Sequence, residues 1–264
     1  MRISVNCPSY KRPKVETLAY LPFCKVWVCE TEADAYRKAN PGFEENIIPC
    51  KKGIQGNVSR IRNHILDTEF ENGADVVCII DDDMKKIGYY ESEPGERFGY
   101  KQNVVPAEEF LGFIERYTRL CEEWGYKMWG ININIDARSY QQNIPFSTLA
   151  FIGGPFACFL RGNECRYDEA LPLKEDYDMT LQNCNRYRGC LRVNKYHYVV
   201  KQAEQAGGCA TYRNYAREEQ QLYALRQKWG SRIVKIDKSN KGKTKKDKVR
   251  IDFNPIIKTP IKGV

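Results

Sequence analysis

Short apolar runs alternate with amphipathic stretches along the first third of the chain, and this alternation predicts strands that alternate with helices. The apolar runs, which are typical of buried strands, cover residues 2–7, 25–30, 44–49 and 76–80. Between the last two runs, SRIRNHILDTEF has the pattern of an amphipathic helix that Asn57 or Ser59 can cap. Strands connected through helices usually form a parallel sheet with both faces covered.

The rest of the chain continues this pattern. Residues 106–124 predict an amphipathic helix that begins near Pro106 and ends before Gly125. Further strands are expected at residues 127–133, 148–153, 156–161, 232–236 and 248–253, and further helices at 174–187 and 212–229. We therefore expect one α/β domain over residues 1–230, with a Rossmann-like, mixed, mostly parallel sheet flanked by helices, and a basic extension over 231–264.

Three adjacent aspartates follow the most apolar strand. In VVCIIDDDMKK, residues 76–80 are followed by Asp81, Asp82 and Asp83, whose like charges repel and are costly to desolvate. A cation would offset them, and oxygen ligands at a rigid strand end hold Mg²⁺ or Mn²⁺ against a diphosphate. Acidic strand ends also occur in phosphatases, polymerases and surface turns, so the pattern alone leaves the metal open. Ligands of parallel sheets bind beyond the carboxyl ends of strands, where residues 8–12, Glu30 and the aspartates can converge.

Composition narrows the class of protein. No apolar run approaches about 18 residues, and the first residues, MRISVNCPSYKRP, lack the pattern of a signal peptide. We therefore expect a soluble, cytoplasmic protein without a membrane partner. The eleven cysteines are odd in number and form no CxxC pair, which favours reduced core thiols over disulfides or a zinc site.

Most of the net charge of +8 lies near the C-terminus. Residues 235–250 contain seven lysines and one arginine against two aspartates, which leaves a net charge of +6. Such a run is either a solvated tail or an arm that binds nucleic-acid phosphates. The sequence alone leaves both interpretations open.

Three ordered motifs resemble those of nucleotide-sugar glycosyltransferases of the GT-A fold: VNCPSYKRP, GIQGNVSRIRNHIL and IIDDDM. The resemblance implies a nucleoside diphosphate sugar as donor, with UDP as the expected nucleotide, and Mn²⁺ or Mg²⁺ as cofactor. It implies donor contacts from residues that line the nucleotide pocket: Pro8, Ser9, Tyr10, Arg12, Glu30, Arg62, Asn63, Asp81 and Asp82. The metal ligands it implies are Asp81 and Asp83, and three aspartates in place of a D-x-D leave open which of the two dominates.

Later motifs resemble the acceptor side of the same fold. LPLKEDYDMTLQ is similar to a Glu-Asp signature at a helix start, which makes Asp176 the candidate base, with Glu175 and Asp178 as alternatives. The same acids can simply complement the helix dipole. His197 falls where such enzymes place a metal-binding histidine, although a histidine in an apolar strand is also often structural. The segment QAGGCATYRN can be a lid over the diphosphate or an ordinary turn.

The combination of these motifs with a basic C-terminal end resembles the TET-associated glycosyltransferases of bacteriophages. That family is inferred to attach sugars to 5-hydroxymethylated pyrimidines in DNA, so the resemblance implies 5-hydroxymethylcytosine or 5-hydroxymethyluracil as acceptor, and the host cytoplasm as location for a phage-encoded enzyme. Two alternatives stay open. One is a glycosyltransferase that acts on a saccharide or a lipid-linked glycan, and the other is a non-catalytic nucleic-acid-binding module of the same fold.

Overall fold

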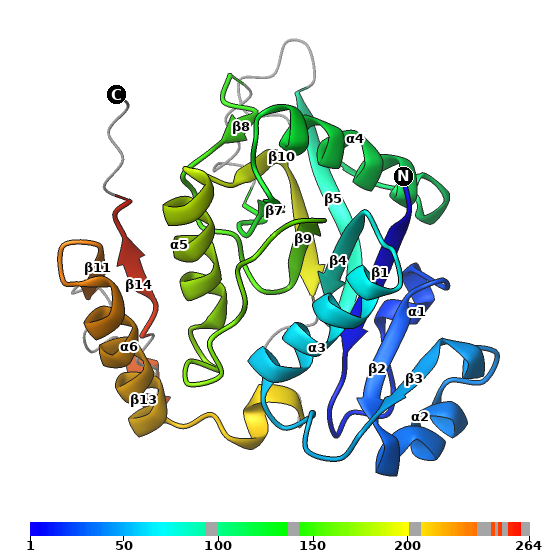
Figure 1. Ribbon diagram of the computed structural model, residues 1–264. Coiled ribbons are helices and arrows are strands. Elements are labelled where there is room, and N and C mark those ends of the chain that lie inside the picture. The colour runs from blue at the N-terminus through cyan, green and yellow to red at the C-terminus, as the bar shows by residue number, and fades with distance from the viewer. Residues whose placement is uncertain are drawn as a thin grey trace.

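A ten-stranded sheet forms the centre of the protein in the computed structural model, which describes residues 1–92, 100–136, 143–200, 207–236, 244–245, 248–249 and 253–259 (Figure 1). The strand order is β3-β2-β1-β4-β9-β7-β10-β5-β6, and β8 pairs with β10 outside this path. The strands of this sheet are β1 (Ile3–Pro8), β2 (Lys25–Cys29), β3 (Ile47–Cys50), β4 (Val76–Ile80), β5 (Met84–Ser92), β6 (Tyr100–Val104), β7 (Met128–Asn132), β8 (Phe146–Ser147), β9 (Phe156–Leu160) and β10 (Leu191–Val200).

Most strands of the sheet run in one direction. Strands β3, β2, β1 and β4 are parallel, and β7 is parallel to β10. Strand β9 is antiparallel to both β4 and β7, and β5 is antiparallel to both β10 and β6. The mixed α/β sheet expected from the sequence is therefore confirmed, with β5, β8 and β9 as its reversed strands.

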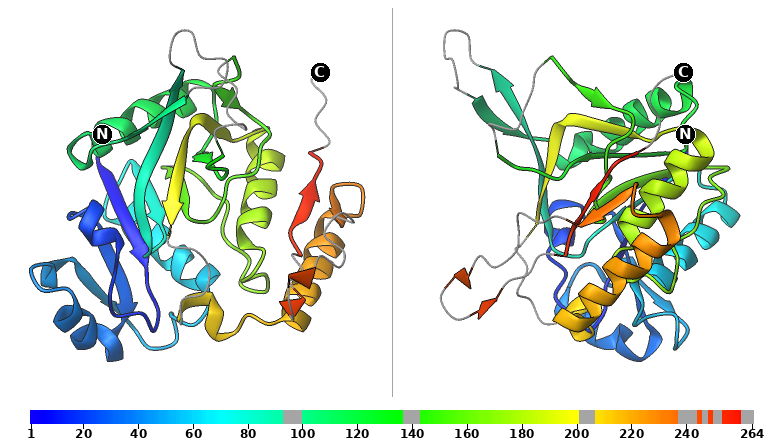
Figure 2. Two further views of the ribbon diagram at one scale, coloured as in Figure 1. Left: turned by 180° about the vertical axis from the view of Figure 1, so that it is seen from behind. Right: turned by 90° about the vertical axis from the view of Figure 1, so that its left-hand side faces the viewer.

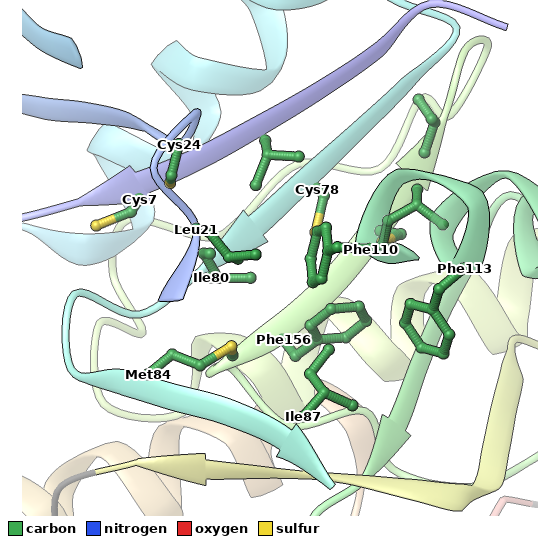
Figure 3. Close-up of a cluster of buried hydrophobic side chains, with 14 of the residues drawn as sticks. Cys7, Leu21, Cys24, Cys78, Ile80, Met84, Ile87, Phe110, Phe113 and Phe156 are labelled. Atoms are coloured by element: carbon green, nitrogen blue, oxygen red, sulfur yellow. The ribbon is translucent and has the colours of Figure 1, made fainter. Parts of the chain in front are cut away.

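Helices cover both faces of the sheet. They are α1 (Thr17–Tyr20), α2 (Ala33–Ala39), α3 (Val58–Glu71), α4 (Phe110–Glu123), α5 (Glu175–Tyr187) and α6 (Tyr215–Trp229). Strand β4 shows why two faces are needed, because all five of its residues are buried. Cys78 and Ile80 pack in the cluster with Phe110 and Phe113 of α4, which Figure 3 shows. The alternate β4 residues pack in the opposite cluster, with residues of α3 and α5. Each fully buried Ile or Phe side chain stabilises the fold by about 1.5–3 kcal/mol.

The C-terminal part of the chain packs beside α5. Helix α6 forms a small core with α5 through Leu181, Leu222 and Leu225. Strand β11 (Val234–Ile236) then pairs antiparallel with β14 (Pro255–Ile257). The views in Figure 1 and Figure 2 place these elements at the side of the sheet away from α2. The short strands β12 (Thr244–Lys245) and β13 (Lys248–Val249) pair with each other.

Most predicted elements appear within a few residues of their expected bounds, and Asn57 caps α3 by accepting from the backbone N–H of Ser59 and Arg60. The strand predicted at residues 148–153 is wrong. There the backbone N–H of Ile152 donates to Thr180 Oγ1 on α5, so the segment pairs with a helix side chain instead of a strand. Of the strand predicted at 248–253, residues 248–249 form β13, residues 250–252 lie outside the described ranges, and β14 begins two residues after Phe253.

All eleven cysteines are free thiols, and ten of them are buried, in agreement with the expected reduced core. No helix among the described residues has the length and apolar character needed to cross a membrane.

Candidate active site

One pocket of about 600 Å³ lies at the ends of β1 and β4 and at the start of α5. We call it the aspartate pocket. Parallel strands β1 and β4 deliver their following loops to the same edge of the sheet, which is where ligands of such sheets bind. Most of the residues predicted from the sequence line it: Pro8, Ser9, Tyr10, Arg12, Arg62, Asp81, Asp82, Asp83, Glu175 and Asp176.

Asp82 ties the loop after β1 to the end of β4. Its carboxylate accepts from Ser9 Oγ and pairs with Arg12 Nη1, each at 2.5 Å. Burial raises the pKa of Asp82, and the guanidinium of Arg12 opposes that rise. Both oxygens are therefore committed to protein groups, and Asp82 shapes the pocket wall.

Arg62 connects the two acidic parts of the pocket. Its guanidinium is only 3% exposed, and it pairs with Asp81 Oδ1 and with Glu175 Oε1 at 3.1 Å each. A third bond, of 3.0 Å, goes to the carbonyl oxygen of Gly154. A Cβ at Gly154 would approach Arg62 Nη1 to 3.1 Å, so the absence of a side chain there makes room for the guanidinium. Arg62 thereby holds the end of β4 and the start of α5 in one arrangement.

Asp83 and Asp81 present the carboxylate oxygens that fit a divalent cation. Burial, followed by the charges of Asp81 and Asp82, raises the pKa of Asp83 to about 7. Within the described residues the Asp83 carboxylate has no side-chain partner, while Asp81 uses Oδ1 for Arg62. The described residues contain no group of three His, Cys, Asp or Glu that could hold a metal. Asp81 and Asp83 both line the pocket, and their carboxylates are of the kind that binds an ion such as Mg²⁺ together with substrate phosphates.

Glu175 and Asp176 begin α5 on the far side of the pocket. Asp176 Oδ2 accepts from the backbone N–H of Gly154 at 3.2 Å, and Oδ1 accepts from that of Tyr177 at 2.8 Å. Burial raises the pKa of Asp176, whereas Arg62 and the N–H of Gly154 lower it. Burial and the neighbouring Asp176 raise the pKa of Glu175 to about 8, against the effect of Arg62. Carboxylates with raised pKa values beside a cleft are suited to proton transfer.

Two of the predicted donor contacts lie outside the aspartate pocket. Asn63 exchanges hydrogen bonds of 2.8 Å with the backbone of Tyr167, so its side chain fixes a loop beside α3. Glu30 is exposed at the end of β2 and accepts from the backbone N–H of Lys52 at 2.9 Å. Neither lines the pocket that holds Arg62 and the aspartates.

His197 also lies away from the aspartates. His197 lies opposite Gly88 in the pairing of β10 with β5. The residue opposite Met84, which directly follows Asp83, is Val200, three residues further along β10. The ring of His197 stacks on Tyr90 with centroids 5.0 Å apart, and Nε2 is 3.1 Å from Gln102 Nε2. Burial and Lys86 lower the pKa of His197 to about 4. The side chain is part of the packing between β10, β5 and β6, and we do not carry it into the proposed metal site.

Asp178 is completely buried one helical turn into α5 and does not line the pocket. Its carboxylate accepts from Trp229 Nε1 at 2.7 Å and from Gln182 Nε2 at 2.6 Å, and it pairs with Lys228 Nζ at 3.0 Å. These contacts attach α6 to α5. Of the three predicted acids, only Glu175 and Asp176 therefore face the space where a substrate can bind.

Replacing Asp178 with alanine is expected to destabilise the protein and to leave donor affinity intact. The change strands the indole N–H of Trp229, whereas Lys228 is partly exposed and keeps its pair with Asp168, so the loss is about 1–3 kcal/mol of unfolding free energy. Urea unfolding measures this loss. The matched control is Glu115→Ala, which breaks an exposed pair with Arg119 and should leave stability close to that of the wild type. Wild-type stability of the Asp178 variant would remove the structural role assigned here.

Gln55, Gly56 and Asn57, which precede α3, line the pocket and were not among the predicted site residues. The segment 208–213 after β10, which the sequence allowed to be a lid or an ordinary turn, also lines it. The Gly207–Gly208 pair was the available signal for this segment. Gly208 donates its N–H to the carbonyl oxygen of Tyr10 at 2.7 Å, and a Cβ at Gly207 would come within 2.6 Å of the Lys11 carbonyl oxygen. Both glycines have positive φ values, so the segment closes against the loop after β1 as only glycine allows.

Comparisons with known proteins identify relatives of this chain. The family described as TET-associated glycosyltransferase matches residues 23–208. No curated protein matches the sequence. Among solved structures, Staphylococcus aureus TarS 1-349 is 15% identical with a TM-score of 0.43, covering 75% of this chain and 59% of that one.

Mycobacterium tuberculosis glucosyl-3-phosphoglycerate synthase, in complex with Mn²⁺, UDP-glucose and phosphoglyceric acid, is 10% identical with a TM-score of 0.45, covering 76% and 72% of the two chains. A nucleotide-diphospho-sugar transferase from Desulfovibrio desulfuricans G20 is 11% identical with a TM-score of 0.41, covering 86% and 98%. The chain thus spans about 59% of the TarS fragment. Similarity at these TM-scores transfers no function from any of the three proteins.

Proposed function

Because the chain belongs to the TET-associated glycosyltransferase family, and is therefore a nucleotide-sugar glycosyltransferase, we propose that it transfers a sugar from a UDP-sugar to the hydroxymethyl group of 5-hydroxymethylcytosine or 5-hydroxymethyluracil in DNA. One structural observation carries the proposal. A single pocket brings the carboxylates after β4 within reach of the carboxylates that begin α5, with Arg62 between them.

We propose the following roles for the pocket residues. Asp81 and Asp83 would hold Mg²⁺ or Mn²⁺, which when bound supplies positive charge for the departing diphosphate. Arg12, Arg62 and the segment around Ser9 and Tyr10 orient the nucleotide side of the donor. The closing segment 208–213 limits the access of water to the donor.

In the transfer step, the hydroxymethyl oxygen forms a bond to the anomeric carbon of the donor sugar. The bond between that carbon and the diphosphate oxygen breaks, and its electron pair leaves with the diphosphate. The hydroxyl proton goes to the carboxylate of Asp176, which lies beside the backbone N–H of Gly154 and lines the pocket. Glu175 stays paired with Arg62 and positions the end of α5.

The DNA acceptor has two lines of support. The family is described by its association with TET enzymes, which fits a hydroxymethylated base as substrate. The net charge of +6 in residues 235–250 is of the kind that binds nucleic-acid phosphates. The side chains of residues 237–252 lie outside the described part of the protein, so this contribution is inferred from the sequence.

The direct test incubates DNA containing 5-hydroxymethylcytosine or 5-hydroxymethyluracil with the protein, Mn²⁺ and a panel of UDP-sugars and other nucleotide sugars. Mass spectrometry of the digested nucleosides should detect a hexosyl mass increase on the modified base. Unmodified DNA is the matched control. Transfer to saccharides or lipid-linked glycans, without transfer to either DNA, would contradict the proposed acceptor.

The basic run should make DNA binding depend strongly on salt. Each neutralised phosphate releases counterions, so about four contacts give a slope of about −3 to −4 in a plot of log K against log salt. The test variant replaces four lysines of the run with serine: Lys243, Lys245, Lys246 and Lys248. This change should flatten the slope and raise the KM for DNA. Hydrolysis of the donor in the absence of acceptor should stay unchanged. Arginine at the same positions keeps the charge and serves as control. An unchanged slope in the serine variant would show that the run is a solvated tail.

A further inference from the structure

A second pocket, of about 520 Å³, adjoins the aspartate pocket. The two pockets share Pro155, Glu175, Asp176 and Arg213, so the proposed base lines both of them. The second pocket therefore meets the donor site at the group that receives the acceptor proton. It contains aromatic side chains from several separate parts of the chain, and we call it the aromatic pocket: Phe151, Tyr177, Tyr198, Tyr215 and Phe253.

Its rings form two pairs from separate elements. Phe151 and Tyr177 stack with centroids 4.1 Å apart and planes at 13°. Tyr215, at the start of α6, and Phe253, just before β14, meet edge to face at 4.9 Å. Tyr215 remains 51% exposed. Flat aromatic surfaces of this kind bind the face of a planar ring, and nucleobases stack on them irrespective of sequence.

The hydroxyl of Tyr198 is available to a ligand. It makes no hydrogen bond to any described residue, although the side chain is largely enclosed at the end of β10. A Cβ at Gly153 would lie 2.7 Å from this oxygen, so Gly153 leaves room for the hydroxyl at the pocket wall. Polar groups in enclosed positions normally have partners, and one without a partner in a pocket indicates a ligand contact.

The other polar side chains of the pocket favour a base over a saccharide. Lys174 is 2% exposed and its ammonium group lies 2.5 Å from Glu218, whose other oxygen pairs with Arg213 at 3.0 Å, so these three charged groups bind one another. A saccharide presents many hydroxyl groups that need partners. A pyrimidine presents two apolar faces and a few edge groups, which matches aromatic walls with a few polar groups such as the hydroxyl of Tyr198.

The C-terminal segment connects this pocket to the basic run. Phe253 lies two residues before β14, which pairs with β11, and the basic run lies between those two strands along the chain. The described residues on either side of the run therefore lie in one strand pair, and Phe253 lies in the wall of the aromatic pocket. A lysine-rich run at this position in the sequence is of the kind that contacts the phosphates flanking a bound base.

We propose that the aromatic pocket receives the hydroxymethylated pyrimidine after it has turned out of the DNA helix, with its hydroxymethyl group directed at Asp176. This inference rests on the proposed function and adds the conformation of the acceptor and its binding site. A stacked base keeps its hydroxymethyl group in the major groove of the duplex. A base turned out of the stack can enter a recess and reach a carboxylate on its wall.

The test compares duplexes in which one 5-hydroxymethylcytosine is paired with guanine, mismatched or opposite an abasic site. Turning out an unpaired base costs less, so kcat/KM should rise about tenfold or more for the mismatched and abasic duplexes. A 2-aminopurine placed next to the target reports unstacking independently of transfer. Its fluorescence should increase when the wild-type protein binds the duplex with UDP.

Substitutions in the aromatic pocket test whether the turned-out base binds there. Phe253→Ala should lower kcat/KM for the paired duplex about tenfold through lost stacking. Tyr198→Phe removes only the hydroxyl and should lower it about 2- to 10-fold, and neither change should alter UDP affinity. Tyr223→Ala, on α6 outside the pocket and 50% exposed, is the matched control and should resemble the wild type.

Equal kcat/KM for all three duplexes, without a fluorescence change, would overturn the proposal even if DNA is glycosylated, because the base would then be read inside the helix. Pocket variants that behave like Tyr223→Ala would also overturn it. If no DNA is glycosylated by any donor, the proposed function fails instead. The 2-aminopurine signal would then still decide whether the protein turns a base out of the stack.

Discussion

Asp83→Ala is expected to lower turnover about 10²- to 10³-fold while the protein stays folded. Asp83 follows the rigid strand β4, and in the described protein its carboxylate has no side-chain partner, whereas Asp82 is held by Ser9 and Arg12. Removing a ligand of a metal that neutralises the leaving diphosphate removes several kcal/mol of transition-state stabilisation. Because the three aspartates repel one another, the variant should be at least as stable as the wild type at neutral pH.

Two measurements check this result. Turnover is measured over a titration with Mn²⁺ or Mg²⁺, and thermal shifts with UDP are compared in the presence and absence of the ion. The wild type should gain stability from UDP and metal together, and the Asp83 variant should lose that cooperative gain. Asp75→Ala, which removes a surface carboxylate paired with Arg161, is the matched control. Full wild-type activity in excess chelator would contradict the metal assignment.

The end of β4 was predictable from the sequence because the relevant interactions are local. Five apolar residues that are buried on both faces must be followed by a loop, and three aspartates in that loop must meet a cation or each other. The start of α5 was predictable for a similar reason, since acids at a helix N-terminus are favoured by the dipole whatever their further role.

The connection between these two acidic parts could not be predicted. Arg62 pairs with Asp81, 19 residues later, and with Glu175, 113 residues later, and no local pattern specifies partners at such distances. The motif around Arg62 indicated the helix and a role near the nucleotide. It gave no sign that the guanidinium would fill the space beside Gly154.

Only the packing of the folded chain shows which of several neighbouring polar residues in a motif faces the aspartate pocket. Asn63 directly follows Arg62, yet the helix turns its side chain to the Tyr167 backbone. Asp178 lies two residues after Asp176, and it faces α6. The aromatic pocket was also hidden, because Phe253 reaches it only through the pairing of β14 with β11 after the basic run.

Asp176→Asn is expected to lower kcat about 10²- to 10⁴-fold, the usual loss for a general base, with UDP affinity unchanged. The amide keeps the size of the side chain, and its one oxygen can keep one of the two bonds that Asp176 accepts from the N–H groups of Gly154 and Tyr177, so the fold should persist. The loss should appear in transfer to DNA at saturating donor and acceptor. Pre-steady-state or single-turnover kinetics would assign it to the chemical step rather than to product release.

Glu175→Gln is the matched comparison, because both acids line both pockets but only Glu175 pairs with Arg62. We expect a smaller kcat loss for this variant, because a glutamine oxygen can still accept from the guanidinium and keep α5 in place. The two variants therefore separate proton transfer from positioning within one helix turn. If Glu175→Gln is the more severely impaired of the two variants, Glu175 is the base. Burial and Asp176 raise the pKa of Glu175 to about 8, and this raised pKa would then serve proton transfer. Asp176 would then act through the backbone N–H of Gly154, as the group that holds the wall between the two pockets.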